Sequence, residues 1–164
     1  MPAIHAIVAL AVVLTSATTA HAACPIELAT YADTDNLAEL EFTPTTESAT
    51  VTNSFRMLLD NGVVLDGVVM WSQDVARPNG MLMHECPEGD VTGAELEACT
   101  VWQGVIYASD EKGDINLLPA EGSAAPQKLI LADLGHSLRL SSGYGAHGFS
   151  TAPFDVFALK GCQE

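Results

Sequence analysis

The residues with the strongest metal-binding chemistry stand close together in the run MLMHEC, which extends from Met81 to Cys86. Thioether and imidazole groups are soft ligands that suit copper ions. In a β-strand, however, alternate side chains point to opposite faces, so Met81 and Met83 would lie on one face and His84 on the other. We therefore expect Met81 and Met83 to be packing residues beside the structural cysteine Cys86. A copper site built from Met81, Met83 and His84 is the alternative.

A second candidate site is the glycine-rich segment SSGYGAHGFS, residues 141–150, which carries Tyr144, His147 and Phe149. Glycine lets the backbone approach a ligand closely, and exposed aromatic rings supply contact area at little entropic cost. These three residues therefore form a candidate binding loop. The alternative is an ordinary long loop whose aromatic side chains fold back on the core.

The sequence holds few residues that are typical of an enzyme. After residue 22 the histidines are His84, His136 and His147, and neither a G-x-S-x-G nor an H-E-x-x-H motif occurs. A carboxylate pair could cleave a glycosidic bond, but 21 Asp and Glu residues offer too many pairs to choose one. We predict a protein without catalytic activity and without a cofactor.

The four cysteines are expected to form disulfides, because an even cysteine count in an oxidising compartment indicates a disulfide framework. Cys24 and Cys162 lie near the two ends of the chain that follows residue 22, whereas Cys86 and Cys99 flank one segment. We predict the pairs Cys24–Cys162 and Cys86–Cys99. The long ring would stabilise the fold by roughly 4 to 5 kcal/mol and the short ring by roughly 3 kcal/mol. The close C-x-x-C spacing of redox-active and zinc sites is absent.

Residues 1–22 have the pattern of a secretory signal peptide. Residues 7–14, IVALAVVL, are an apolar run too short to span a bilayer, and residues 20–22, AHA, match the small-x-small cleavage pattern. The run before the apolar core lacks Lys and Arg, unlike a typical signal peptide. We predict a periplasmic or secreted protein in which residues 23–164 form a single β-rich domain, with no membrane insertion after cleavage.

The composition is strongly acidic, since 21 Asp and Glu against 6 Lys and Arg give a formal net charge of −15 at pH 7. All of these charges lie after residue 22. Nucleic acid and anionic lipid both require a cationic patch, so neither is expected as a partner. The partner is expected to be an unknown protein or a small ligand, and the acidity favours a cationic one. The simpler explanation of the acidity is a solvated surface.

Residues 49–71 are predicted to form one long β-hairpin. Two apolar-rich segments flank Asn61-Gly62, and this dipeptide favours a two-residue type I′ turn. Such a turn predicts these pairs across the hairpin: Leu59 with Val64, and Phe55 with Val68. A bulge is expected at Gly67, because glycine inside a strand often marks one.

Several further segments alternate apolar and polar residues as strands do, at intervals of about ten residues. A first strand is expected from Ile26 to Tyr31 and a turn from Asp33 to Asn36. Together these segments predict an all-β fold. It would be an antiparallel β-sandwich or a small closed β-barrel of about eight strands, with at most one or two short helices and two disulfides.

The two short helices are predicted from their first residues. Thr92 and Glu95 have the spacing of a capping box and indicate a helical turn that runs through Ala98. Asp133 is expected to cap a second helix over residues 134–140, for which a bent strand is the competing prediction.

These observations favour a non-enzymatic binding or interaction module. A small acidic β-domain whose ends are joined by a disulfide is similar in class to bacterial inhibitors of basic lysozymes, although no motif is shared and no residue role carries over. That similarity implies an acidic inhibitor of a cationic protein as one alternative function. Copper binding in the periplasm, through Met81, Met83 and His84, is the other.

Overall fold

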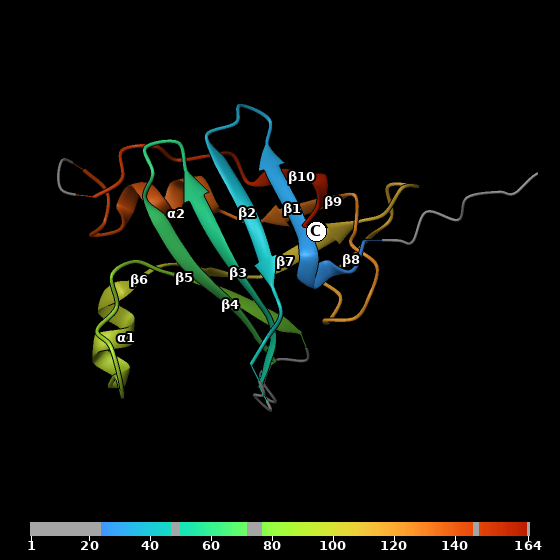
Figure 1. Ribbon diagram of the computed structural model, residues 1–164. Coiled ribbons are helices and arrows are strands. Elements are labelled where there is room, and N and C mark those ends of the chain that lie inside the picture. Colours follow the sequence, from blue (N-terminus) through green and yellow to red (C-terminus); the bar gives the residue numbers. More distant parts are fainter. Residues whose placement is uncertain (1–23, 47–49, 72–76, 146–147, 164) are drawn as a thin grey trace, which may run out of the picture.

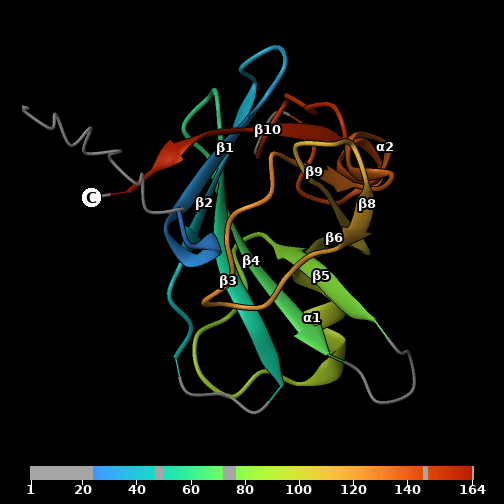
Figure 2. The same cartoon turned by 90° about the vertical axis from the view of Figure 1, so that its right-hand side faces the viewer.

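An antiparallel sheet of ten strands makes up most of the fold, in the order β6-β5-β4-β3-β2-β1-β10-β9-β7-β8. The computed structural model describes residues 24–46, 50–71, 77–145 and 148–163, and the statements below concern these residues. The predicted signal peptide, residues 1–22, lies outside them. The sheet curls strongly, as the two views in Figures 1 and 2 show. No helix in the described part of the chain is long and apolar enough to cross a membrane.

The strands are short and follow one another closely along the chain. Their bounds are β1 Ala29–Asp33, β2 Ala38–Thr43, β3 Val51–Leu59, β4 Val64–Trp71, β5 Pro78–Met83, β6 Thr100–Gly104, β7 Ile106–Ser109, β8 Ile115–Leu117, β9 Lys128–Leu131 and β10 Val156–Cys162. The helices are the 3-10 turn η1 Ile26–Leu28, α1 Gly93–Cys99 and α2 Leu134–Leu140. The predicted all-β class, the antiparallel pairing and the two short α-helices are confirmed. The first predicted strand is wrong at its start, because η1 precedes β1.

The continuous segment Thr100–Ser109 pairs with two strands that lie far apart in the strand order. β6 pairs with β5, and β7, which follows after Val105, pairs with β9. The curl brings apolar side chains from every strand except β8 into a single core, in which Trp102 and Tyr31 are among the largest buried side chains. The Trp102 indole N–H donates to the Ala132 carbonyl oxygen at 2.9 Å. The Tyr31 hydroxyl donates to the Pro126 carbonyl oxygen at 3.0 Å, and burial raises the pKa of this hydroxyl.

The hairpin of β3 and β4 forms, but its turn differs from the predicted one. The Leu59 N–H donates to the Val63 carbonyl oxygen at 2.9 Å, so the loop consists of Asp60, Asn61 and Gly62. Gly62 has a φ of 84°, whereas Asn61 does not adopt a positive φ, as a type I′ turn requires. The longer loop shifts the register by one residue. The observed pairs are Leu58 with Val64 and Phe55 with Gly67.

This register decides which face of β4 is buried, because a shift of one residue exchanges the two faces of a strand. Leu65 and Val69 are the residues that enter the core, and Val64 and Val68 are on the outer face. Gly67 is not a bulge. The ring of Phe55 lies against it, and a Cβ atom there would be 2.5 Å from that ring. Because Gly67 has no side chain, the Phe55 ring can pack directly against its backbone.

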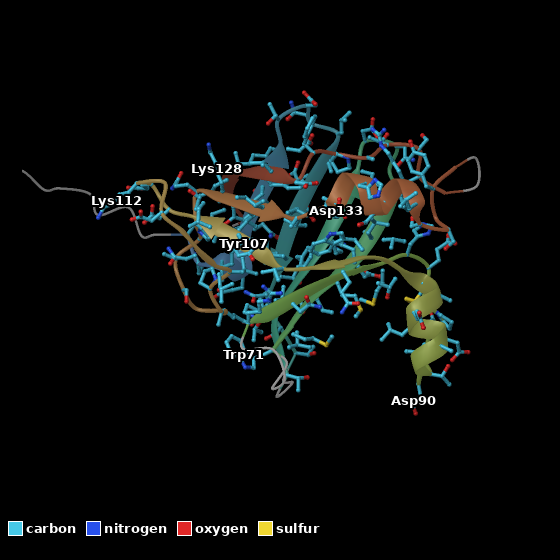
Figure 3. All side chains as sticks on the ribbon, turned by 180° about the vertical axis from the view of Figure 1, so that it is seen from behind. Trp71, Asp90, Tyr107, Lys112, Lys128 and Asp133 are labelled. Atoms are coloured by element: carbon cyan, nitrogen blue, oxygen red, sulfur yellow. A yellow bond between two sulfur atoms is a disulfide. The ribbon has the colours of Figure 1, made fainter. Side chains whose placement is uncertain are left out.

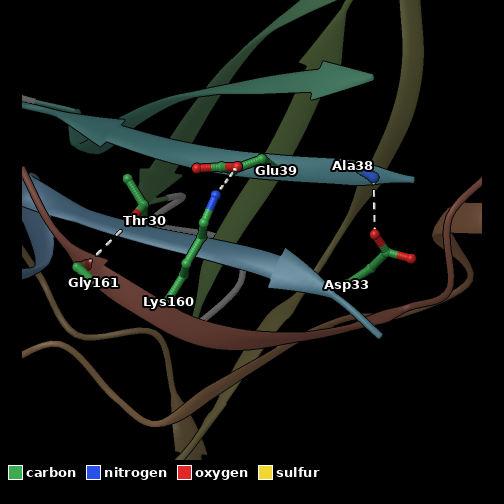
Figure 4. A network of polar contacts seen from close by, with 6 residues as sticks. All are labelled: Thr30, Asp33, Ala38, Glu39, Lys160 and Gly161. Atoms are coloured by element: carbon green, nitrogen blue, oxygen red, sulfur yellow. Dashed lines mark hydrogen bonds and ion pairs between the residues drawn. The ribbon is translucent and has the colours of Figure 1, made fainter. Parts of the chain in front are cut away.

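The predicted turn after β1 is confirmed and is held by a buried carboxylate (Figure 4). Asp33 is 3% exposed, and its Oδ1 accepts a hydrogen bond from the Ala38 N–H at 2.8 Å. On the neighbouring strands, the Thr30 hydroxyl donates to the Gly161 carbonyl oxygen at 3.3 Å, and Lys160 forms an ion pair with Glu39 at 2.6 Å. These contacts connect the last strand to the first two, and the exposed ion pair adds little stability.

Both predicted disulfides are present. Cys24 is bonded to Cys162, with 5.7 Å between the Cα atoms, and Cys86 is bonded to Cys99, with 5.2 Å between them. The first bond joins the chain before η1 to the end of β10. The second joins the segment after β5 to the end of α1. Disulfides of this kind are typical of proteins in an oxidising compartment.

Helix α2 forms where predicted, but its cap comes from elsewhere. Asp133 adopts a left-handed conformation with φ 62°, and its side chain makes no capping hydrogen bond. The carboxylate of Asp155, which precedes β10, accepts from the Asp133 N–H at 2.9 Å and from the Gly135 N–H at 3.2 Å. A distant carboxylate thus satisfies the N–H groups that a helix leaves unpaired at its start.

Replacing Asp155 by alanine is expected to lower the free energy of unfolding by about 1 kcal/mol, because the first N–H groups of α2 lose their acceptor. Chemical denaturation measures this change. Asp133→Gly is the control. It removes the carboxylate that sequence reasoning favoured, keeps a residue suited to a positive φ, and should be nearly neutral. A larger loss for Asp133→Gly than for Asp155→Ala would contradict the assignment of the cap.

Candidate functional site

A cleft of about 470 Å³ opens beside β5, between the segment closed by the Cys86–Cys99 disulfide and the glycine-rich loop that follows α2. In Figure 1, helix α1, which supplies one wall, and helix α2, which precedes the other, both lie toward the left of the view. The residues that line the cleft are His84, Glu85, Pro87, Glu95, Ala98, Cys99, Val101, Ser142, Gly143, Tyr144 and Gly148. Two segments far apart in the sequence therefore form one concave surface.

His84, which directly follows β5, lines the cleft and packs against an aromatic ring that lies beneath it. The His84 N–H donates to the Cys99 carbonyl oxygen at 2.9 Å, which extends the pairing beyond β5. The imidazole ring meets the Phe149 ring edge-on, with 5.6 Å between centroids. Phe149 is fully buried. It therefore acts as a packing residue that holds His84.

The glycine-rich loop folds back on itself. The Phe149 N–H donates to the Gly143 carbonyl oxygen at 3.0 Å, and the Gly145 N–H donates to the Phe149 carbonyl oxygen at 2.9 Å. A Cβ at Gly148 would lie 2.0 Å from the Gly143 carbonyl oxygen, so this close approach requires glycine. The loop geometry is thus specified by its glycines.

Tyr144 is the aromatic side chain that this loop presents to solvent. It is 37% exposed, and its ring meets the Phe149 ring edge-on with 6.0 Å between centroids. Its hydroxyl donates to the Ser150 carbonyl oxygen at 2.9 Å, which restrains the ring. Of the predicted binding loop, Tyr144 borders the cleft and Phe149 lies beneath it. His147 is outside the described residues.

The opposite wall is helix α1, which begins with the predicted capping box. The Glu95 N–H donates to the Thr92 hydroxyl at 3.3 Å, and the Thr92 N–H donates to Glu95 Oε2 at 2.9 Å. The Thr92 hydroxyl also lies 2.8 Å from the same Oε2. Hydrogen bonds from the Thr92 backbone and side chain lower the pKa of Glu95, so its carboxylate is ionised at neutral pH.

Glu85, the second acid of the cleft, has an unusual backbone. Its φ of 50° is in the left-handed region, which non-glycine residues rarely occupy. Strained residues of this kind are concentrated at functional sites. The chain bends at His84 and Glu85, and Glu85 lines the cleft.

The residues of the alternative copper site do not lie on one face of the sheet. Leu82 is buried in the core, so the alternation along β5 places Met81 and Met83 on the opposite face of the sheet. His84 instead contacts Phe149 at the cleft. Within the described ranges, no group of three or more His, Cys, Asp or Glu side chains is arranged to hold a metal ion.

Sequence reasoning did not identify Glu85, Glu95 or Ser142 as residues of one site. Glu95 was singled out only as part of a capping box, and the 21 acids of the chain gave no reason to choose Glu85. Trp71, an exposed aromatic of β4, does not line the cleft, and Figure 3 shows it well apart from Asp90, which precedes α1. The signal that could have found the site is the disulfide ring, which contains Glu95 and begins directly after Glu85.

Comparison of the chain with protein-family models, with curated proteins and with solved structures finds no match.

Proposed function

We propose that the protein is a non-enzymatic binding module of the periplasm or the extracellular space, and that its ligand enters the cleft between α1 and the glycine-rich loop. The observation that carries this proposal is the meeting of the predicted binding loop with the disulfide-closed segment at one concave surface. Its volume of about 470 Å³ falls in the range of small-ligand sites. Two further clefts of similar volume lie between β8 and residues 124–127 and between residues 109–113 and 127–128, and neither involves that loop.

Both walls of the cleft are held in place without a ligand. The Cys86–Cys99 disulfide and the capping box restrain α1, and the close contact of Gly143 with Gly148 restrains the loop. A preorganised site loses little conformational entropy when it binds, so more of the contact energy contributes to affinity. This rigidity favours a binding function.

The protonation state of Glu95 argues against this residue as the general acid of a glycoside hydrolase. A general acid for glycoside hydrolysis needs a carboxyl group with a raised pKa, so that it carries a proton at neutral pH. The hydrogen bonds from Thr92 lower the pKa of Glu95 instead. Cys99, which could otherwise supply a nucleophile, is bonded to Cys86.

The proposed compartment and the finer fold assignment rest on separate observations. The signal-peptide pattern of residues 1–22 and the two disulfides favour export to the periplasm or to the extracellular space. We also propose that the sheet closes into a barrel of about eight strands, in which β6 and β7 count as one continuous strand and β8, at the end of the strand order, lies outside the closed set. The run Thr100–Ser109 supports this because it pairs with β5 at its start and with β9 at its end.

A substitution that fills the cleft tests the proposed function. Ala98 lines the cleft and is exposed on α1, so Ala98→Trp should block it without a large change in stability. Ala94→Trp is the matched control, because it makes the same change on the same helix at an exposed position outside the lining. Fragments of neutral, anionic and cationic character are screened by ¹H–¹⁵N NMR. We expect fragments that shift the cleft amides of the parent and Ala94→Trp proteins but not of Ala98→Trp. Equal binding by all three proteins would overturn the proposal.

A further inference from the structure

The charges that line the cleft are of one sign. Glu85 and Glu95 are its acidic residues, and no Lys or Arg of the described chain lines it. The ion pairs within these ranges, Arg56–Glu41 and Lys160–Glu39, lie on the sheet surface. The two carboxylates of the cleft therefore lack a cationic partner within the described part of the chain.

Both carboxylates retain free hydrogen-bonding capacity. Glu95 accepts the Thr92 hydrogen bonds through Oε2, which leaves Oε1 without a partner in the described ranges. The Glu85 side chain has neither a hydrogen bond nor an ion pair among these residues. Ionised carboxylates accept only, so the complementary ligand group is a donor, and a charged donor forms the stronger hydrogen bond.

The remaining lining suits the apolar body of a ligand. The half-exposed Tyr144 ring and the Ala98 and Val101 side chains provide an apolar surface beside the two acids. An aromatic ring also attracts a cation placed over its face. The cleft, at about 470 Å³, is larger than a bare ammonium group requires. It has room for a cation together with its alkyl chain.

We infer that the cleft between Glu85, Glu95 and Tyr144 binds an alkylammonium or guanidinium group, with the carboxylates accepting its hydrogen bonds and Tyr144 contacting its alkyl stem. This inference rests on the proposed binding function and adds the ligand class. The net charge of −15 attracts such ligands from a distance. The cation belongs either to a free diamine or to a Lys or Arg side chain of a basic protein.

The test titrates the full oxidised protein with 1,5-diaminopentane, agmatine and the neutral isostere 1,5-pentanediol, and separately with a basic lysozyme. Binding is followed through the cleft amides by ¹H–¹⁵N NMR. Glu85→Gln and Glu95→Gln are each expected to weaken binding of the cations by about two- to fivefold, the effect of one exposed charge pair. Glutamine at position 95 still completes a capping box, so the helix is retained.

Glu111→Gln is the control for net charge, because Glu111 is exposed and does not line this cleft. The Glu111→Gln variant should bind the cations as tightly as the parent protein. For both proteins, binding of the cations should weaken as the ionic strength rises. Shifts with the diamines would assign the cation to a free ligand, and shifts with the basic protein alone would assign it to a side chain. Pentanediol binding as tightly as diaminopentane, or no cation binding at all, would overturn the inference. If neutral fragments still bound and were blocked by Ala98→Trp, the proposed function would stand without it.

Discussion

Removing the Cys24–Cys162 disulfide is expected to lower the free energy of unfolding by about 4 to 5 kcal/mol. The double variant Cys24→Ser with Cys162→Ser opens a ring whose ends are 138 residues apart. Without the bond the unfolded chain regains the conformational entropy that the ring had removed, whereas the folded strands β1 and β10 keep their pairing. Equilibrium unfolding in denaturant measures the difference between the oxidised parent and the variant.

The effect of removing the Cys86–Cys99 bond can be compared with that of removing the long-ring disulfide in the same protein. The Cys86–Cys99 bond closes a ring with a sequence separation of 13, so the double serine variant should lose only about 3 kcal/mol. This second variant should also release α1 and thereby weaken the proposed ligand binding, because α1 supplies Glu95 and Ala98 to the cleft. A long-ring variant that unfolds at the same denaturant concentration as the parent would show that loop closure does not control the stability of this fold.

Replacing Phe149 by alanine is expected to cost about 3 to 5 kcal/mol, the usual range for truncating a buried phenylalanine. The ring is fully buried and is in contact with both His84 and Tyr144. Its loss leaves a cavity beneath the cleft and removes the surface against which these two rings pack. Thermal or chemical denaturation gives the stability change, and NMR of the imidazole signals reports on His84.

The control for Phe149→Ala lies close by in the sequence. Phe154 is 70% exposed, so Phe154→Ala makes the same chemical change with little loss of buried surface. Its effect should remain within about 0.5 kcal/mol. If both variants lost equal stability, the assignment of Phe149 as the packing residue of the loop would be wrong. If Phe149→Ala instead stayed as stable as the parent, the loop would not be anchored through this ring.

Features that depend on neighbouring residues were predictable from sequence. The Thr92 capping box and the Asp33 turn are both present, because each needs only hydrogen bonds across a few residues. The cap of α2 was assigned to the wrong residue. Asp133 has the right type and position, but the structure uses Asp155, which reaches the helix only after the chain has returned to the sheet.

The hairpin shows how tertiary packing overrides a local preference. The Asn61-Gly62 dipeptide favours a two-residue turn, yet the loop also includes Asp60. With the observed register the Phe55 ring lies over Gly67, and Leu65 is fully buried. The packing of the core therefore selects the register, and a pattern in which both faces of β4 are apolar cannot reveal that choice.

The amino-acid sequence was sufficient for the β-rich class, the acidic charge and the two cysteine pairs, because composition, alternation and cysteine position carry this information directly. It also pointed to the Tyr144 segment as a candidate binding loop. The opposite wall of the cleft, with Glu85 and Glu95, emerges only in the folded chain. This site forms because the curl of the sheet brings the end of β5 close to the loop after α2. A local sequence pattern does not show which distant segments become neighbours in the folded chain.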